Sequence, residues 1–452
     1  MKRLRFAVLT ALLISATPLW AQTPASTVVR DAADSATVAR TEYRNARETL
    51  ARGDTTAALD KLVIAAQAWP VQPAYASALL ELSVRVHDFK RAAIALAMAN
   101  RIGVALTVSA PATALLDSAR EMESLRALRA EQNVLGAPLI RSRTFRTLND
   151  STLFPEGLAI DPRNGMVYVS SVRHRNVIAV ATDGRESFLL WGERANVGGI
   201  FGIVVDTTRG VLWAASAPNA AMIAKGDTGA AVAALLAIRL SDGQLIRRIA
   251  IPLSAANSSP GDIALAANGD VLLSDSQAPV LWWLRGTSDT LIGIRHHLFR
   301  SLQGIVPSAD GKVAWVADYS HGLLRVELNT CTVPAGDEHN TCVVQRVADL
   351  PGHTTVGLDG MVRFGDSFIA VQNGFVPTQV LQIVLNATGT RVVQQSVIDR
   401  NPIATSPTGG VVVRDQFIYI ANSLWELLDD AGKFPLHALL PRPMLLQLPL
   451  RK

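Results

Sequence analysis

The chain has 452 residues, which is enough for two or three domains, and its apolar-rich composition excludes a wholly disordered protein. Its formal charge is +5, but three of the basic residues are Lys2, Arg3 and Arg5, so the remainder carries only +2 and has no basic block suited to nucleic acid. Beyond the N-terminal segment, no stretch is long and apolar enough to span a bilayer. We therefore expect no nucleic-acid partner and no membrane span.

Residues 1–22, MKRLRFAVLTALLISATPLWAQ, are typical of a secretory signal peptide. A basic start precedes a short apolar run, and small residues close the segment near Ala21. No cysteine lies near this cleavage region, so we expect no lipid anchor there. A buried first helix is the alternative interpretation. The signal peptide predicts a periplasmic or secreted protein.

Residues 23–135 are rich in alanine, leucine and arginine and show the apolar spacing of helices. Two stretches, RGDTTAALDKLVIAAQ and VHDFKRAAIALAMANR, align with an offset of 34 residues. The alignment pairs Asp54 with Asp88, Ala58 with Ala92, Leu62 with Leu96 and Ala65 with Ala99. This period, with small residues where helices cross, resembles the tetratricopeptide repeat. A plain pair of helical hairpins is the alternative, and we expect the module to dock a protein partner rather than to carry catalytic residues.

The pattern changes after Leu135, where short strand-like runs alternate with turns. Six similar phrases begin at Glu156, Phe201, Gly261, Gln303, Asp359 and Gly409. Each interval has room for four short strands, which predicts an all-β six-bladed β-propeller over residues 136–452. The last repeat lacks an outer strand, and we expect residues 139–148 to supply it and close the ring.

Two cysteines, Cys331 and Cys342, flank a short polar loop. In an exported protein this arrangement predicts a disulfide. A pair of metal ligands is the alternative, but thiolate metal sites usually contain a closer pair.

Polar residues occur where four of the six inner strands of the propeller would begin, beside the central channel. Three carboxylates and an amide, from Glu156, Asp262, Asp359 and Gln303, would converge there from distant parts of the sequence. The ends of the second strands add His174, Asp275, Asp318, Asn373 and Asn422. Like charges so close repel, and a hard divalent cation would relieve the repulsion. Alternatively, these residues satisfy backbone groups or line a water-filled channel.

From Leu139 to Lys452 the repeats resemble the family of gluconolactonase, senescence marker protein and luciferin-regenerating enzyme, and more distantly the paraoxonases and strictosidine synthase-like propellers. The resemblance implies a six-bladed propeller with one divalent cation in its channel, which we expect to be calcium. It implies that Glu156, before Gly157, is a ligand, and that Asp359, in the sequence Asp-Gly-Met, is a ligand and general base. The middle ligands depart from the family pattern, because Gln303 replaces an asparagine and Asp262 follows a glycine rather than an asparagine.

Five residues are candidates for catalytic or pocket roles at the top of the channel. His174, beside Arg173, could act as a second base while the arginine holds an anionic substrate; a solvated turn between two strands is the alternative interpretation. Asn373, Asn422 and Trp425 are candidate pocket residues. The sequence has no nucleophile elbow, zinc-protease motif, phosphate loop or dinucleotide fingerprint.

These features predict an exported divalent-metal-dependent hydrolase that acts on a small lactone or ester. The alternative is a non-catalytic propeller that binds a peptide or glycan, with the helical repeats docking a protein partner. Whether the protein is an enzyme stays open at this level.

Overall fold

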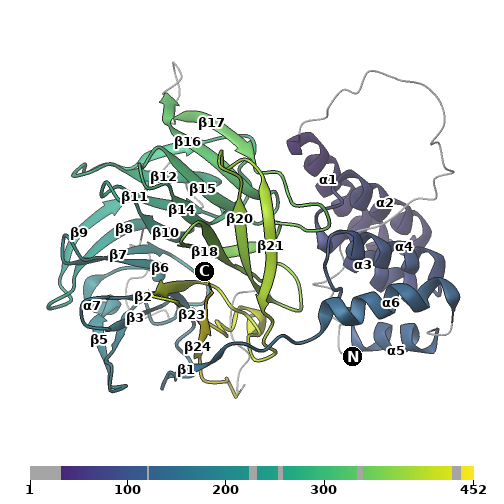
Figure 1. The fold of residues 1–452 in the computed structure, drawn as a ribbon, viewed down its shortest axis with the longest axis horizontal. Helices are drawn as coiled ribbons and strands as arrows, with labels where there is room; N and C mark the ends of the chain where they lie inside the picture. The colour runs from purple at the N-terminus through teal and green to yellow at the C-terminus, as the bar shows by residue number, and fades with distance from the viewer. Residues whose placement is uncertain are drawn as a thin grey trace. The chain divides into compact units, whose positions relative to one another are not determined.

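The computed structural model of the chain describes residues 32–119, 122–222, 232–252, 258–332, 340–429 and 439–451. The predicted signal peptide lies outside these residues. Contacts within the chain define a helical unit and a β unit, each compact (Figure 1).

The helical unit contains α1 (Ala32–Ala51), α2 (Thr55–Ala68), α3 (Pro73–Arg85), α4 (Phe89–Arg101), α5 (Ala110–Ser118) and α6 (Glu123–Gly136). One of the pairs that the 34-residue offset aligns, Asp54 and Asp88, caps helices: each residue is the N-cap of its helix. Their carboxylates accept hydrogen bonds from the N–H groups of Ala57 (2.9 Å) and Arg91 (3.0 Å). The aligned alanines and leucines of α2 and α4 are all buried, so equivalent positions have equivalent roles in the two helices.

Two short segments from far downstream, residues 349–356 and 375–377, belong to the same helical unit. Thr354 donates its hydroxyl to the carbonyl oxygen of Val71 (2.8 Å), and Thr107 donates to that of Val376 (2.8 Å). The helical unit is therefore not made of the N-terminal sequence alone.

The β unit consists of six four-stranded antiparallel sheets, which are the blades of a propeller. This confirms the six-bladed fold predicted from the repeats. The first three blades are β2 (Pro155–Ile160), β3 (Val167–Ser171), β4 (Val177–Val180) and β5 (Glu186–Leu190); β6 (Gly199–Asp206), β7 (Val211–Ala217), β8 (Ala234–Arg239) and β9 (Leu245–Ala250); and β10 (Pro260–Leu265), β11 (Val271–Asp275), β12 (Val280–Leu284) and β13 (Ile292–Arg295). A short helix, α7 (Gly192–Ala195), follows the first blade.

The remaining blades complete the ring (Figure 1). They are β14 (Leu302–Pro307), β15 (Val313–Asp318), β16 (Gly322–Thr332) and β17 (Thr341–Arg346); β18 (Leu358–Phe364), β19 (Ser367–Gln372), β20 (Gln379–Leu385) and β21 (Val392–Asp399); and β22 (Gly410–Val413), β23 (Gln416–Ile420), β24 (Met444–Pro449) and β1 (Arg143–Thr147). The last blade takes its outer strand from before the first, because β1 pairs with β24, with Arg143 opposite Gln447. This is the closure expected from residues 139–148, and it pairs the first strand of the ring with the last.

Apolar side chains fill the spaces between neighbouring blades. One buried cluster joins Val172, Trp213 and Trp282 from the first three blades, and both indole rings are almost fully enclosed. A short 3-10 helix, η2 (Trp425–Leu427), follows β23 and packs against the same cluster.

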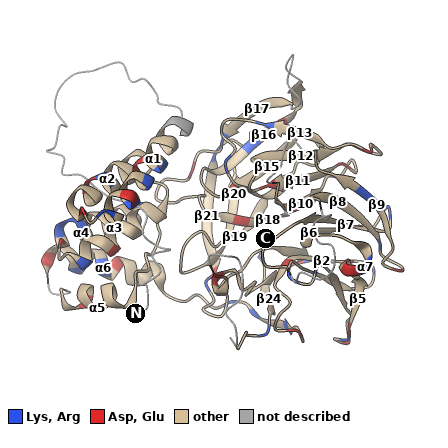
Figure 2. Ribbon diagram, turned by 180° about the vertical axis from the view of Figure 1, so that it is seen from behind, with Lys and Arg blue, Asp and Glu red and all other residues tan. Residues whose placement is uncertain are grey.

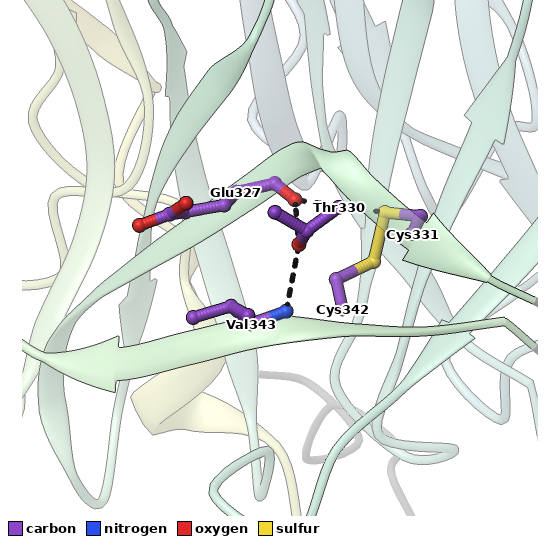
Figure 3. The surroundings of a disulfide bond; sticks show 5 residues. All are labelled: Glu327, Thr330, Cys331, Cys342 and Val343. Carbon is purple, nitrogen blue, oxygen red and sulfur yellow. Dashed lines mark hydrogen bonds between the residues drawn. A yellow bond between two sulfur atoms is a disulfide. The ribbon is translucent and has the colours of Figure 1, made fainter.

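The predicted disulfide is present between Cys331, near the end of β16, and Cys342, near the start of β17 (Figure 3). Beside it, Val343 donates its N–H to the hydroxyl oxygen of Thr330 (2.9 Å), and that hydroxyl donates to the carbonyl oxygen of Glu327 (2.7 Å). The bond and these contacts fasten the outer hairpin of the fourth blade.

Acidic and basic residues are interspersed along the helices and strands rather than gathered by sign (Figure 2). Within the described ranges, no helix has both the length and the apolar character needed to cross a membrane.

Candidate functional site

Each inner strand carries one pair of residues at the same place, where the six strands converge on the propeller axis. Five pairs lie within β2, β6, β10, β14 and β18, and the sixth begins just before β22. These axial pairs are Glu156–Gly157, Phe201–Gly202, Gly261–Asp262, Gln303–Gly304, Asp359–Gly360 and Gly409–Gly410.

In five of the six blades the pairing between the first and second strands is irregular across this pair. In β2, for example, Pro155 pairs with Ser171 and Leu158 with Val169, so that Glu156 and Gly157 are skipped. The same break occurs in β6, β10, β14 and β18. Such bulges change the direction of side chains and are common beside active sites. They release Glu156, Asp262, Gln303 and Asp359 from the regular alternation of the sheet.

The glycines of these pairs let the inner strands approach closely around the axis. A Cβ atom on Gly157 would collide with the carbonyl oxygen of Phe201, and one on Gly304 would lie 2.5 Å from that of Asp359. Gly409 closes the circle with more space, because its Cβ would lie 3.4 Å from the carbonyl oxygen of Glu156. Lack of space thus explains the glycine at Gly157, Gly202, Gly304 and Gly360, where a Cβ would lie less than 3.0 Å from a neighbouring backbone atom.

Serines of the second strands satisfy two of the backbone N–H groups that the bulges release. Ser170 accepts a hydrogen bond from Gly157 N–H (2.7 Å), and Ser274 accepts one from Asp262 N–H (3.2 Å). The bulged geometry is therefore supported by specific side chains.

Three axial carboxylates, those of Glu156, Asp262 and Asp359, are close enough to influence one another's ionisation, and all three are half-buried. Burial, followed by the charge of Asp359, raises the pKa of Asp262 to about 7. Burial also raises the pKa of Glu156 well above its usual range, with Asp359 and Asp262 adding to the rise and the indole of Trp425 opposing it. Near neutral pH it is therefore energetically unfavourable for all three carboxylates to be ionised at once.

Hydrogen bonds from a side chain and from the backbone hold the carboxylate of Asp359. Burial raises its pKa to about 6, while hydrogen bonds from Asn373 and from Gly360 N–H oppose the rise. Asn373 donates its Nδ2 to Asp359 Oδ2 (2.5 Å) and to the carbonyl oxygen of Pro407 (2.7 Å). Tyr319 in turn donates its hydroxyl to Asn373 Oδ1 (3.0 Å).

Glu156 is contacted from the last blade. Trp425 Nε1 donates to Glu156 Oε2 (2.7 Å), and the indole ring meets the ring of Phe154 edge-on, with centroids 4.5 Å apart. The preceding residue, Leu424, has a positive φ of 74°, which turns the chain into η2. Trp425 was a candidate pocket residue from sequence, and the structure places it directly on the first axial carboxylate.

Gln303 is the fourth candidate ligand. Its Nε2 lies 3.4 Å from the hydroxyl oxygen of Ser301, and its Oε1 lies 3.9 Å from where a Cβ on Gly261 would be. The amide oxygen therefore lies beside the backbone that carries Asp262.

The donor set suits a hard divalent cation, since it offers only carboxylate and amide oxygens. Yet in the described ranges, no group of three or more His, Cys, Asp or Glu side chains meets the geometry expected of a metal site. The oxygen atoms of the axial residues therefore fit such a cation by their chemistry, although the three carboxylates do not form a cluster with metal-site geometry.

A cavity of about 50 Å³ lies among the inner strands, lined by Asp262, by Gly157, Gly202 and Gly360, and by apolar side chains. This volume suits an ion or a few water molecules but not a sugar-sized substrate. A substrate would have to reach the carboxylates from outside this cavity.

Other predicted residues have different surroundings. His174 lies in the turn between β3 and β4, close to Arg173, with its Nε2 2.9 Å from Thr152 Oγ1 and 3.1 Å from Asp150 Oδ2. Asn422 is buried after β23, where its Nδ2 donates to Arg442 O (3.2 Å) and its Oδ1 accepts from Met444 N–H (2.7 Å). The amide of Asn422 thus joins the end of β23 to the start of β24.

Asp275 and Asp318, at the ends of β11 and β15, serve the backbone. Asp275 accepts hydrogen bonds from the backbone N–H groups of Ser259, Gln277 and Ala278. Asp318 accepts hydrogen bonds from the backbone N–H groups of Arg300, Ser301, Ser320 and His321. For these two residues the alternative interpretation, satisfaction of backbone groups at strand ends, describes the contacts that the structure shows.

Tyr319 was not among the candidates. Burial, together with the nearby charge of Asp359, raises the pKa of its hydroxyl, which therefore keeps its proton and can donate to Asn373. Its only signal in the sequence is its place directly after Asp318, at the end of a second strand.

No protein-family model matches the chain, and no curated protein matches its sequence. Among solved structures, a gluconolactonase from Xanthomonas campestris is 16% identical, with a TM-score of 0.44 over 70% of this chain and 93% of that one. A luciferin-regenerating enzyme is 11% identical, with a TM-score of 0.44 over 69% and 95%. A PQQ-bound aldose sugar dehydrogenase from Streptomyces coelicolor is 14% identical, with a TM-score of 0.43 over 69% and 99%. These structures include a gluconolactonase and a luciferin-regenerating enzyme, two of the proteins that the sequence repeats resemble.

Proposed function

We propose that this protein is a divalent-metal-dependent hydrolase of lactones or related esters, with the cation at the propeller axis. The observation that carries the proposal is a set of three half-buried carboxylates, which bulged strands bring together from three blades. In this set, the charges of Asp359 and Asp262 raise the pKa of Glu156 further than burial alone. Ionising these neighbouring carboxylates costs free energy, and a bound cation would offset that cost and stabilise the folded protein.

Glu156, Asp262, Gln303 and Asp359 would hold the cation through oxygen atoms. Calcium is the ion we propose, because it accepts several oxygen ligands in flexible geometry, whereas magnesium requires a nearly ideal octahedron. When bound, the cation would polarise the substrate carbonyl and stabilise the negative charge that develops on its oxygen.

Asp359 would act as the general base. Its carboxylate accepts hydrogen bonds from Asn373 and Gly360 N–H, which favour the ionised form that a base requires. It would take a proton from the attacking water. His174, which contacts Asp150 and Thr152, has no part in this proposal.

A periplasmic or secreted location belongs to the same proposal. The N-terminal sequence and the disulfide between Cys331 and Cys342 support it, because disulfides persist in oxidising compartments.

The second candidate is a non-catalytic propeller that binds a peptide or glycan, with the helical unit docking a protein partner. The small size of the axial cavity, about 50 Å³, favours this candidate.

The two functions are separated by assaying metal-stripped protein on a panel of sugar lactones and aryl esters, with and without calcium. We expect hydrolysis only with the cation, and a loss of at least about 100-fold in kcat for Asp359→Asn, since an amide cannot accept the proton. Asp366→Asn, an exposed change at the other end of the β18–β19 hairpin, is the matched control and should keep full activity. Calcium binding without turnover on any substrate would favour the non-catalytic candidate.

A further inference from the structure

Three side chains from the fourth and fifth blades form a directed hydrogen-bonded chain that ends on Asp359. Tyr319 follows β15, Asn373 follows β19, and Asp359 lies in β18. The tyrosine hydroxyl donates to Asn373 Oδ1 (3.0 Å), and Asn373 Nδ2 donates to Asp359 Oδ2 (2.5 Å). Because Nδ2 also donates to Pro407 O (2.7 Å), both amide hydrogens are used.

The orientation of the Asn373 amide follows from the chemistry of its partners. The Pro407 carbonyl oxygen can only accept a hydrogen bond, and so can an ionised Asp359 carboxylate. The nitrogen of Asn373 must therefore face both, which leaves its oxygen facing Tyr319. A flipped amide would set oxygen against two acceptors and leave the tyrosine hydroxyl without its acceptor.

Backbone hydrogen bonds link the segments that carry Tyr319, Asn373 and Asp359. Gly357 donates its N–H to Tyr319 O (3.1 Å), and Gly374, directly after Asn373, donates its N–H to Gly357 O (3.1 Å). The two glycines touch, since a Cβ on Gly357 would lie 2.9 Å from the Cα of Gly374. The loop ends that carry Tyr319 and Asn373 are thus fixed relative to the strand that carries Asp359.

We propose that Tyr319 and Asn373 are positioning residues that fix the orientation of the Asp359 carboxylate at the propeller axis. This inference rests on the proposed function for its consequence in metal binding, but not for the geometry itself. Neither residue is assigned a contact with substrate. They act by holding one carboxylate oxygen so that Asp359 keeps a single orientation when a cation or water arrives.

The first test is calcium affinity, measured by calorimetry on the full chain. Partners that orient a metal ligand typically contribute 10- to 100-fold to metal affinity, so we expect Tyr319→Phe to weaken calcium binding by about tenfold and Asn373→Leu by more. Tyr419→Phe is the matched control. It also loses a buried hydroxyl, which donates to Asp399 Oδ2 (2.7 Å), but not one in this chain. Its calcium affinity should equal that of the wild type.

The second test needs no metal. Selective labelling with ¹⁵N-asparagine gives the side-chain amide signals of Asn373, assigned by their loss in Asn373→Leu. We expect these signals to shift and their hydrogens to exchange faster in Tyr319→Phe, but not in Tyr419→Phe. A wild type that binds no calcium would overturn the proposed function. The positioning role is overturned instead if the Asn373 signals are the same in Tyr319→Phe as in the wild type, whatever the protein binds.

Discussion

Two sets of buried acids in the propeller differ in how they are held. The strand-end acids Asp275 and Asp318 are completely buried, and three or four backbone N–H groups converge on each. The axial acids Glu156, Asp262 and Asp359 are only half-buried, and their neighbours include one another. Burial alone would rank the strand-end acids as the more unusual.

The difference shows that the number of hydrogen-bond donors, rather than burial, separates a structural acid from a candidate functional one. A carboxylate surrounded by N–H groups has its charge balanced by the fold itself. Carboxylates that raise one another's pKa leave a charge that the fold does not balance, and such groups concentrate at functional sites.

The largest effect should come from removing a strand-end acid. Asp318→Ala would leave four backbone N–H groups without their acceptor, and each buried unsatisfied donor costs about 1–3 kcal/mol. We expect the free energy of unfolding, measured by urea denaturation, to fall by at least about 3 kcal/mol. The exposed Asp415→Ala should change it by less than about 0.5 kcal/mol. A loss below about 1 kcal/mol for Asp318→Ala would contradict the structural role.

A second large effect should come from the space around the axis. In Gly157→Ala the new methyl group would collide with Phe201 O, whereas in Gly409→Ala the nearest atom would be 3.4 Å away. We expect the first variant to lose about 2–3 kcal/mol of stability by overpacking and the second to lose less than about 1 kcal/mol. Equal losses in the two variants would show that the glycines are not distinguished by space.

A moderate effect should appear in the pH dependence of the metal-free protein. The pKa values of Asp262 and Asp359, about 7 and about 6, are higher in the folded chain than the usual value of about 3.9 when unfolded. The folded state therefore holds protons more tightly, so this contribution to stability is complete below about pH 4 and is lost as the pH rises through 6 and 7. We expect a decline of about 1–3 kcal/mol, reduced by the partial exposure of the side chains. Asp359→Asn should make the decline shallower, and a profile identical to that of the wild type would contradict the raised pKa values.

The smallest effect should come from the serine that supports the first bulge. Ser170→Ala removes the acceptor of Gly157 N–H (2.7 Å), which should cost about 1 kcal/mol in thermal or urea unfolding. Ser187→Ala, at an exposed position of β5, should have no measurable effect. The bulge does not depend on this hydrogen bond if the two serine variants are equally stable.

The architecture could be predicted from sequence because it repeats. Six similar phrases fixed the number of blades, and the missing strand of the last phrase predicted that residues before Glu156 would close the ring. The aligned residues Asp54 and Asp88 likewise have equivalent places, directly before α2 and α4. In each case the information lies within one local period of the chain.

The surroundings of the axial acids could not be predicted in the same way. The contact between Trp425 and Glu156 joins residues 269 positions apart, and that between Tyr319 and Asn373 spans 54. No period relates such residues, so only the folded ring brings them together. Asp262 and Asp275 cannot be told apart from sequence either. They differ in the backbone N–H groups that the fold brings to each carboxylate, and these become known only from the structure.

The most direct test of the axial site uses terbium, a luminescent ion with the oxygen preference and nearly the size of calcium. Energy transfer from tryptophan to bound terbium falls steeply with distance, and the Trp425 indole lies 2.7 Å from Glu156 Oε2. We predict tryptophan-sensitised emission that saturates at one ion per chain, that calcium displaces, and that is lost in Glu156→Gln and Asp359→Asn. Trp425→Phe should weaken the emission, while calorimetry still detects one ion. Emission of equal strength in the wild type, Glu156→Gln and Asp359→Asn would contradict the assignment of a cation to the propeller axis.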